Sequence, residues 1–375
     1  MSDMSGPPFR ADHVGSLLRP AALLRARREH EAGRLSAAEL RRVEDGAIAE
    51  VVRKQSEVGL RGVTDGEFRR GSWHMDFLYR IGGVGKSDRV LNIRFRNSEG
   101  GTVEFSPTAH RVAGKLKLDE TIFGEDFAFL KSAAPAGTTA KLTIPSPSML
   151  HYRGGRAAID QNVYPDMDQF WHDLALVYRQ EIAALSALGC SYLQLDDTSL
   201  AYLNDPAQRA YVDSIGGDGA TQHLTNIKVI NQALAGRPPG MTVTTHMCRG
   251  NFRSSWMAEG GYDHVAEALF GGLDVDGFFL EYDDARSGGF TPLRFVPRGK
   301  KRVVLGLVTS KRAALEAKDE LKRRIDEAAK YVPLEQLCLS PQCGFSSTVE
   351  GNRITEAEQF AKLRLVVETA REVWG

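Results

Sequence analysis

The chain has 375 residues, and its 48 Lys and Arg balance 48 Asp and Glu, so the formal net charge at pH 7 is zero. This balance excludes electrostatic attraction to nucleic acid or to an anionic membrane as the main role. No apolar run reaches the roughly 20 residues that span a bilayer, no signal-peptide pattern opens the chain, and four cysteines are too few for a disulfide scaffold, so we expect a cytoplasmic enzyme.

Short β-rich runs alternate with longer amphipathic segments along the chain. Each short run ends in polar residues or in residue types that are common in active sites. The eight predicted strands cover 9–15, 62–65, 140–144, 192–195, 241–246, 277–281, 302–308 and 336–340.

Amphipathic helices are predicted between these strands. Ser36 with Glu39, and Thr355 with Glu358, are capping-box patterns that mark two helix starts. The alternation predicts a (β/α)8 TIM barrel that forms a single domain over 1–375, with a doubly wound sheet as the structural alternative. Helices are expected over 40–58, 168–188, 310–332 and 355–373.

One segment departs from the strand–helix alternation. Residues 88–118 alternate polar and apolar side chains with period two on both sides of the turn-forming residues 98–101. This pattern is typical of a β-hairpin, which we expect as an insertion after the second strand.

Four metal-binding residue types stand at the ends of predicted strands. In a barrel the carboxyl ends of the strands meet at one mouth. His246 and Cys248 are two positions apart and can face the same side, while Glu281 ends the next strand and Cys343 follows the eighth. All four are zinc ligands, and thiolates favour zinc over magnesium or calcium. The alternative is four polar strand-end residues that hold no ion.

Six segments resemble the cobalamin-independent methionine synthase family. The first group is similar to the zinc-site segments of that family: 245–251 (THMCRGN), 280–283 (LEYD) and 340–345 (SPQCGF). The second group is similar to its substrate segments, in the same order: 13–16 (HVGS), 64–67 (TDGE) and 194–197 (QLDD). The chain is most similar to short single-barrel members, which match the catalytic C-terminal half of the long enzymes.

The resemblance implies a zinc-dependent S-methyltransferase of the 5-methyltetrahydropteroyltriglutamate–homocysteine type. His246, Cys248, Glu281 and Cys343 would hold Zn²⁺. A free thiol is mostly protonated at pH 7, and coordination to zinc deprotonates it. The methyl group, from 5-methyltetrahydrofolate, must then lie in line with the sulfur of homocysteine, so positioning supplies much of the catalysis.

The resemblance also implies a set of substrate-binding residues. Gly15 and Ser16 would bind the carboxylate of homocysteine. Glu67 and Asp196 would hold its amino group, with Asp197 as a second acid beside them. A structural alternative for the two aspartates is that they hold magnesium or cap the next helix.

One departure leaves the proton donor unassigned. Long members of the family carry a His after the seventh strand, which is thought to protonate the departing folate, whereas 306–311 here reads GLVTSK. A tertiary amine leaves poorly unless it is protonated, so the acid and the methyl donor stay open. The candidates are Lys311, His13 and His74 for the acid, and Tyr152, Trp73 and Trp256 for an aromatic ring that stacks on a pterin.

Two alternative functions follow from this departure and from the metal residues. The first keeps the chemistry but changes the substrates, for example coenzyme M attacking an epoxide, or a corrinoid methyl donor. The second is a binding protein with a closed, structural zinc. The expected partners are a small-molecule thiol and a methyl donor, and a homo-oligomer is compatible with the sequence.

Overall fold

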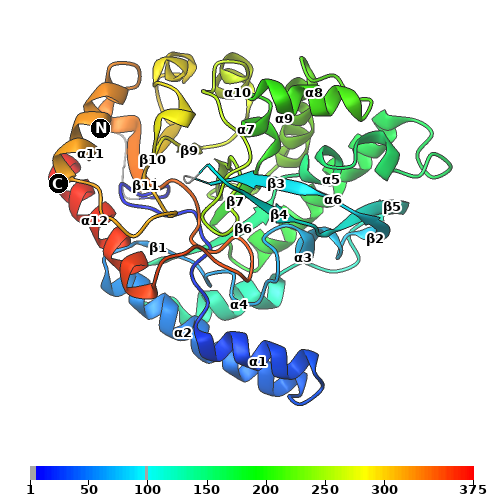
Figure 1. Cartoon of the computed structure of the whole chain (residues 1–375), viewed down its shortest axis with the longest axis horizontal. Coiled ribbons are helices and arrows are strands. Elements are labelled where there is room, and N and C mark those ends of the chain that lie inside the picture. The colour runs from blue at the N-terminus through cyan, green and yellow to red at the C-terminus, as the bar shows by residue number, and fades with distance from the viewer. Residues whose placement is uncertain (1–5, 98–99) are drawn as a thin grey trace.

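The computed structural model describes residues 6–97 and 100–375, and its centre is a curled parallel sheet (Figure 1). The strands follow chain order without reversal, which excludes the doubly wound sheet because that fold reverses its strand order. The result is an α/β fold consistent with a TIM-like barrel. Its strands are β1 (Gly62–Val63), β6 (Thr139–Pro145), β7 (Tyr192–Asp197), β8 (Thr242–Met247), β9 (Gly277–Glu281), β10 (Arg302–Val308) and β11 (Leu337–Pro341).

The first predicted strand, 9–15, is not a regular strand. Its only bridge to the sheet among the described residues is parallel, between Ala11 and Leu339 of β11. The backbone N–H of Asp12 donates to Leu339 O at 3.0 Å. The carboxylate of Asp12 in turn accepts from the backbone N–H of His13 at 2.8 Å. Such local side-chain bonds compete with a strand ladder, which explains why the segment stays irregular.

Helices surround the sheet, and α1 projects away from it (Figure 1). Both predicted capping boxes are present, at Ser36 with Glu39 and at Thr355 with Glu358. The helices are α1 (Ala21–Glu31), α2 (Ala37–Glu57), α3 (Met75–Leu78), α4 (Gly124–Ala133), α5 (Met149–Tyr152), α6 (Met167–Ala187), α7 (Ser199–Tyr202), α8 (Pro206–Ser214), α9 (Gln222–Leu234), α10 (Ala266–Gly272), α11 (Lys318–Ala329) and α12 (Glu356–Trp374).

The helix predicted over 310–332 begins later than expected, since α11 covers only Lys318–Ala329. The residues before it are bound to the loop after β11. The backbone N–H of Ser310 donates to Gln342 Oε1 at 2.6 Å, and the Ser310 hydroxyl donates to Gly344 O at 3.0 Å. These contacts hold the connection at the mouth of the barrel.

The insertion after β1 consists of two antiparallel pairs rather than the one hairpin predicted over 88–118. The outer pair is β2 (Gly82–Val90) with β5 (Thr108–Lys117), and the inner pair is β3 (Ile93–Arg96) with β4 (Thr102–Phe105). The ladder divides because Pro107 has no backbone N–H and because the outer register shifts between Lys86 and Val90. Residues 98 and 99 of the predicted turn lie outside the described residues.

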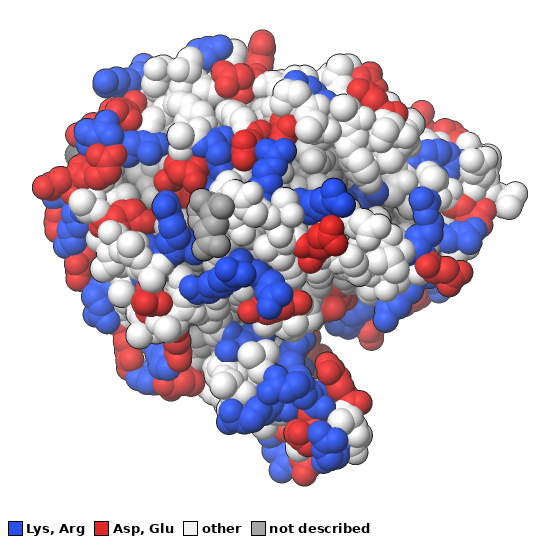
Figure 2. Space-filling view, viewed as in Figure 1, with Lys and Arg blue, Asp and Glu red and all other residues white. Residues whose placement is uncertain are grey.

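The surface and the helices give two further findings. On the face drawn in Figure 2, acidic and basic side chains are interspersed. In the part of the chain that the structure describes, no helix has the length and apolar character needed to cross a membrane.

A buried ion pair lies inside the barrel, at the end away from the mouth. Lys141 Nζ is 3.3 Å from Asp12 Oδ1, and both side chains are fully buried. The hydroxyl of Tyr192 donates to the other oxygen of Asp12 at 2.7 Å, and Lys141 also donates to His13 O at 2.5 Å. This network links the irregular first segment to β6 and β7.

Replacing Asp12 with Ala is expected to lower the free energy of unfolding by about 3–5 kcal/mol, because the Lys141 charge would remain buried without its partner. Urea unfolding measures this loss. The control is Asp12→Ala combined with Lys141→Met, which leaves no buried charge and should recover part of the stability. A double variant less stable than Asp12→Ala would contradict the explanation.

Candidate metal centre and substrate cavity

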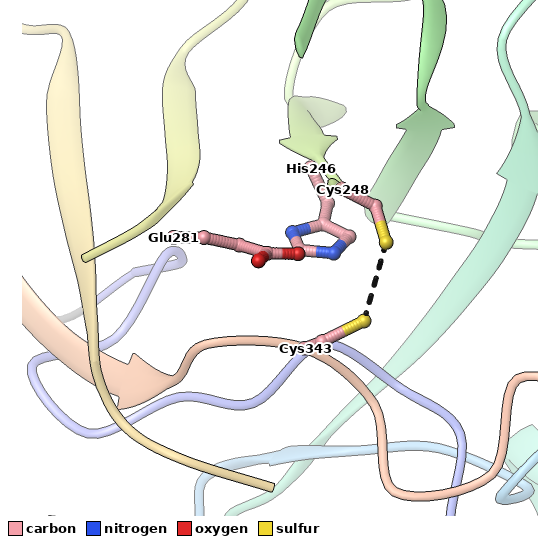
Figure 3. A group of neighbouring side chains, drawn as sticks. All are labelled: His246, Cys248, Glu281 and Cys343. Atoms are coloured by element: carbon pink, nitrogen blue, oxygen red, sulfur yellow. Dashed lines mark hydrogen bonds between the residues drawn. The ribbon is translucent and has the colours of Figure 1, made fainter. Parts of the chain in front are cut away.

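The four predicted metal residues meet at the mouth of the barrel (Figure 3). His246 lies at the end of β8 and Cys248 directly after that strand, while Glu281 ends β9 and Cys343 follows β11. One ligand atom from each residue can be chosen so that all four lie within 4.8 Å of one another, and all four residues are buried. The carboxyl ends of three strands therefore bring together residues that are far apart in sequence.

The two cysteine sulfurs are in direct contact. Cys248 Sγ and Cys343 Sγ are 3.4 Å apart, and the backbone N–H of Gly250 donates to Cys248 Sγ at 3.3 Å. The hydrogen bond from Cys248 and the neighbouring His246 hold the pKa of Cys343 well below its usual value. The same pairing, together with burial, raises the pKa of Cys248. The site therefore favours one thiolate even before a cation is considered.

Several buried polar atoms at this point lack a partner. Among the described residues, both ring nitrogens of His246 and Oε2 of Glu281 lack a hydrogen-bond partner. A buried polar atom without a partner costs about 1–3 kcal/mol. Two sulfurs, an imidazole nitrogen and a carboxylate oxygen that converge in this way fit a soft, four-coordinate divalent ion such as Zn²⁺.

Glu281 is held by its own set of cationic neighbours. The backbone N–H of Arg249 donates to Glu281 Oε1 at 2.9 Å, and Arg286 Nη2 lies 3.7 Å from Oε2. Burial raises the pKa of Glu281, while the charge of Lys311 acts in the opposite direction. The Lys311 ammonium is itself buried and has no hydrogen bond among the described residues. Lys311 thus acts on the metal residues from outside the cavity rather than from its wall.

A cavity that opens to solvent adjoins the metal residues. Three of the predicted substrate residues line it, namely Ser16, Glu67 and Asp196, whereas Gly15 and Asp197 do not. An apolar part of the wall comes from the inserted strands and the loop after β8. This wall contains Leu91, Ile93, Phe95, Phe105, Pro107 and Phe252.

Glu67 is fixed in an unusual backbone conformation, with φ of 60°. Its Oε1 accepts from Thr143 Oγ1 at 2.9 Å and lies 3.7 Å from Arg70 Nη1, while Oε2 has no hydrogen bond among the described residues. Arg19 donates to the carbonyl of Glu67 at 2.8 Å. Burial raises the pKa of the Glu67 carboxyl. A left-handed, non-glycine residue that is held this firmly is typical of functional sites.

Asp196 faces the same cavity from the end of β7. Gln194 Nε2 donates to its Oδ1 at 2.7 Å and fixes the carboxyl. Burial raises the pKa of Asp196 to about 7, with His246 lowering it and Glu67 raising it further. Two acids that face one cavity, one from the turn after β1 and one from β7, can together receive a cationic group of a ligand.

Gly15 and Ser16 pass close to two other segments. Gly15 has φ of 145°, and a Cβ at this position would lie 2.7 Å from Thr143 Cγ2. The hydroxyl of Ser16 would lie 2.0 Å from a Cβ at Gly344, the residue after Cys343. Glycine at these positions lets the backbone lie close to the side chains of Thr143 and Ser16.

Asp197 has a different environment from the one predicted. Its oxygens accept from Ser148 Oγ at 2.5 Å, from Ser199 Oγ at 2.8 Å and from the backbone N–H of Leu200 at 2.8 Å. Because consecutive strand residues point to opposite faces, Asp197 points away from the side that Asp196 faces. Its contacts match the alternative that it caps the following helix.

The candidates for the proton donor and for the stacking ring differ in whether they line the cavity. Burial lowers the pKa of His13 to about 4 and that of His74 to about 3, so both are neutral at pH 7. His74 lines the cavity and His13 does not. Of the three candidate aromatic rings, Trp73 lines the cavity, whereas Tyr152 and Trp256 lie outside it.

Sequence reasoning did not identify several cavity residues. Asn251 donates to Gly344 O at 2.7 Å and joins the loops after β8 and β11. Its position three residues after Cys248 is a sequence feature from which its place in the cavity could be predicted. Arg153, Phe95 and Phe252 carried no such signal, since they reach the cavity from an inserted pair and from two loops.

The chain is similar to a described protein family and to proteins of two organisms. Residues 138–372 match the family model described as cobalamin-independent synthase, catalytic domain. The YxjH protein of Bacillus subtilis (strain 168), described as uncharacterized, is 49% identical over 98% of this chain and 95% of its own length. The methionine synthase of Pyrococcus abyssi (strain GE5 / Orsay) is 24% identical over 91% of this chain and 87% of its own length.

A solved structure is similar over the whole molecule. It is described as the putative vitamin-B12 independent methionine synthase from Listeria monocytogenes, which is 42% identical to this chain with a TM-score of 0.79. The match covers 98% of each chain.

Proposed function

The chain belongs to the cobalamin-independent methionine synthase family, and we propose that it is a zinc-dependent S-methyltransferase that converts homocysteine to methionine. The observation that carries this proposal is the meeting of four buried donor atoms beside a cavity with two buried acids. The proposed methyl donor is 5-methyltetrahydrofolate.

The proposed metal residues are His246, Cys248, Glu281 and Cys343. When bound there, zinc supplies the positive charge that lowers the pKa of a coordinated thiol and keeps its sulfur nucleophilic at neutral pH. Glu281 is the ligand best placed to give way to the substrate thiol. The backbone N–H of Arg249 and the guanidinium of Arg286 offer its carboxylate other partners.

The chain's own residues orient the amino-acid part of homocysteine. We assign its ammonium group to Glu67 and Asp196, whose carboxyls both line the cavity. We assign its carboxylate to the backbone of Gly15 and the hydroxyl of Ser16 beside Gly344. With both groups fixed, the thiol is directed to the metal residues, of which His246, Cys248 and Cys343 line the same cavity. The proposed catalysis is therefore largely positioning.

The overall reaction conserves protons, so its stoichiometry does not require a histidine after β10. Methyl transfer from the donor nitrogen to sulfur forms a C–S bond and breaks a C–N bond, and the proton lost by the thiol equals the proton gained by the departing amine. His13 and His74 are neutral at pH 7, so neither holds a proton ready for transfer. This observation supports a second candidate function with other substrates. Either a corrinoid methyl group replaces methylfolate as the donor, or coenzyme M and an epoxide replace homocysteine and methylfolate.

A donor panel with quantified metal tests the proposal. Homocysteine and coenzyme M are each combined with methylfolate, methylcobalamin and an epoxide, and the zinc content is measured beforehand. Methionine formed from homocysteine and methylfolate is the expected result. Turnover of coenzyme M alone would select the second candidate, and stoichiometric zinc without alkylation of either thiol would reject the reaction class.

X-ray absorption at the zinc edge separates a catalytic site from a structural one. A catalytic site has a position that exchanges for substrate, whereas a structural site is closed. Adding homocysteine is expected to increase the number of sulfur neighbours from two to three. An unchanged spectrum at saturating homocysteine would support the structural alternative.

A further inference from the structure

Arg153 occupies a defined position in the cavity wall. It follows α5, and its carbonyl accepts from the hydroxyl of Tyr211 at 2.6 Å. Its guanidinium carbon lies 5.4 Å from the ring centre of Tyr152 and 5.2 Å from that of Tyr202. Arginine over aromatic rings is held by cation–π attraction. The guanidinium is thus positioned in a cavity that sequence reasoning had not connected with it.

This arginine has no acidic partner among the described residues. Its Nη2 donates to Met257 Sδ at 3.2 Å, which is a weak acceptor, and the guanidinium otherwise lies against Tyr152 and Tyr202. By contrast, Arg70 has Glu67 within 3.7 Å. A guanidinium carries five N–H donors in a fixed fork that matches a carboxylate. Several of these donors remain available to a ligand.

Arg153 differs in charge from the other residues that line the cavity. Arg153 is the single Lys or Arg among the described residues that line it. The two acids, Glu67 and Asp196, belong to the end that we assign to homocysteine. The apolar wall formed by the β3–β4 pair and Phe252 adjoins Arg153, because Met257, which accepts from its Nη2, packs against the same cluster. A ligand with an apolar body and an anionic end is complementary to this half of the cavity.

We propose that Arg153 is a specificity residue that binds a carboxylate at the end of the methyl donor, while the body of the donor lies against the apolar wall. This inference rests on the proposed function, because it assumes that the second ligand is a methyl donor. The charge of Arg153 also acts on another residue of the cavity wall, since after burial it is the next cause that lowers the pKa of His74. A donor without a carboxylate would gain nothing from this residue.

The test compares two donors, one with and one without the part that carries the carboxylates. These are 5-methyltetrahydrofolate and a 5-methyltetrahydropterin that lacks the aminobenzoyl-glutamate part. Arg153→Met is expected to raise KM for the folate about 10- to 100-fold, the worth of a hydrogen bond to a charged group. KM for homocysteine and for the pterin should stay unchanged, and Arg153→Lys should recover part of the loss. Arg156→Met is the matched control, since Arg156 donates to Ile159 O and Tyr164 O outside the cavity.

Binding without turnover separates this inference from the proposed function. Calorimetric titration of the zinc-loaded enzyme with each donor, in the absence of any thiol, needs no reaction. If the wild type binds the folate and Arg153→Met binds it 10- to 100-fold more weakly, the inference holds even when no methionine forms. Equal weakening for both donors, equal weakening in Arg156→Met, or no folate binding by the wild type would overturn it.

Discussion

Replacing Cys343 with Ser is expected to remove stoichiometric zinc and to lower kcat/KM at least about 1000-fold. Cys343 supplies the sulfur that has the lower pKa of the pair, and it lies 3.4 Å from Cys248 Sγ. A hydroxyl in its place is a poor ligand for zinc, and the remaining three residues leave the metal incompletely bound. Metal analysis by mass spectrometry and assay with homocysteine and methylfolate measure the two effects.

The control for this substitution is available in the same chain. Cys338 is also buried, but it packs with Val14, Phe279 and Val304 rather than facing the metal residues. Cys338→Ser should therefore keep its zinc and its activity, while any loss of stability from a buried hydroxyl appears in both variants. Full zinc content in Cys343→Ser, or equal zinc loss in both variants, would contradict the assignment.

The periodicity of the sequence was sufficient to predict the frame of the molecule. Seven of the eight predicted strands are present among the described residues, and both capping boxes occur where Ser36 and Thr355 predicted them. The convergence of His246 and Cys343 could be predicted because parallel strands all end at one mouth. These features depend on local pattern and on one topological rule.

The features that sequence reasoning missed depend on contacts between distant segments. The 9–15 segment is irregular because the side chain of Asp12 accepts from the backbone N–H of His13, which no periodicity reveals. The sequence pattern groups Asp197 with Asp196, but strand alternation separates the two carboxyls, and the contact of Asp197 with the distant Ser148 is visible only in the structure. Arg153 comes from a loop, where neither strand nor helix period applies.

Replacing Glu67 with Gln is expected to lower kcat/KM for homocysteine about 30- to 1000-fold, the range for truncating one partner of a buried charge pair. The Gln side chain keeps the shape and the hydrogen bond from Thr143, but it removes the charge proposed to face the ammonium group. Because φ of Glu67 is 60°, a substitution that keeps the side-chain length disturbs the backbone least. Steady-state kinetics over a range of homocysteine concentrations measures the change.

The effect must depend on the amino group if the assignment is right. A thiol acid of the same length without the amino group, 4-mercaptobutyrate, should react equally slowly with the wild type and with Glu67→Gln. Glu44→Gln is the matched control, since Glu44 is a buried acid paired with Arg27 at 3.2 Å outside the cavity. An equal loss for both thiols would mean that Glu67 supports the cavity through Arg70 and Thr143 rather than by binding the ammonium group of the substrate.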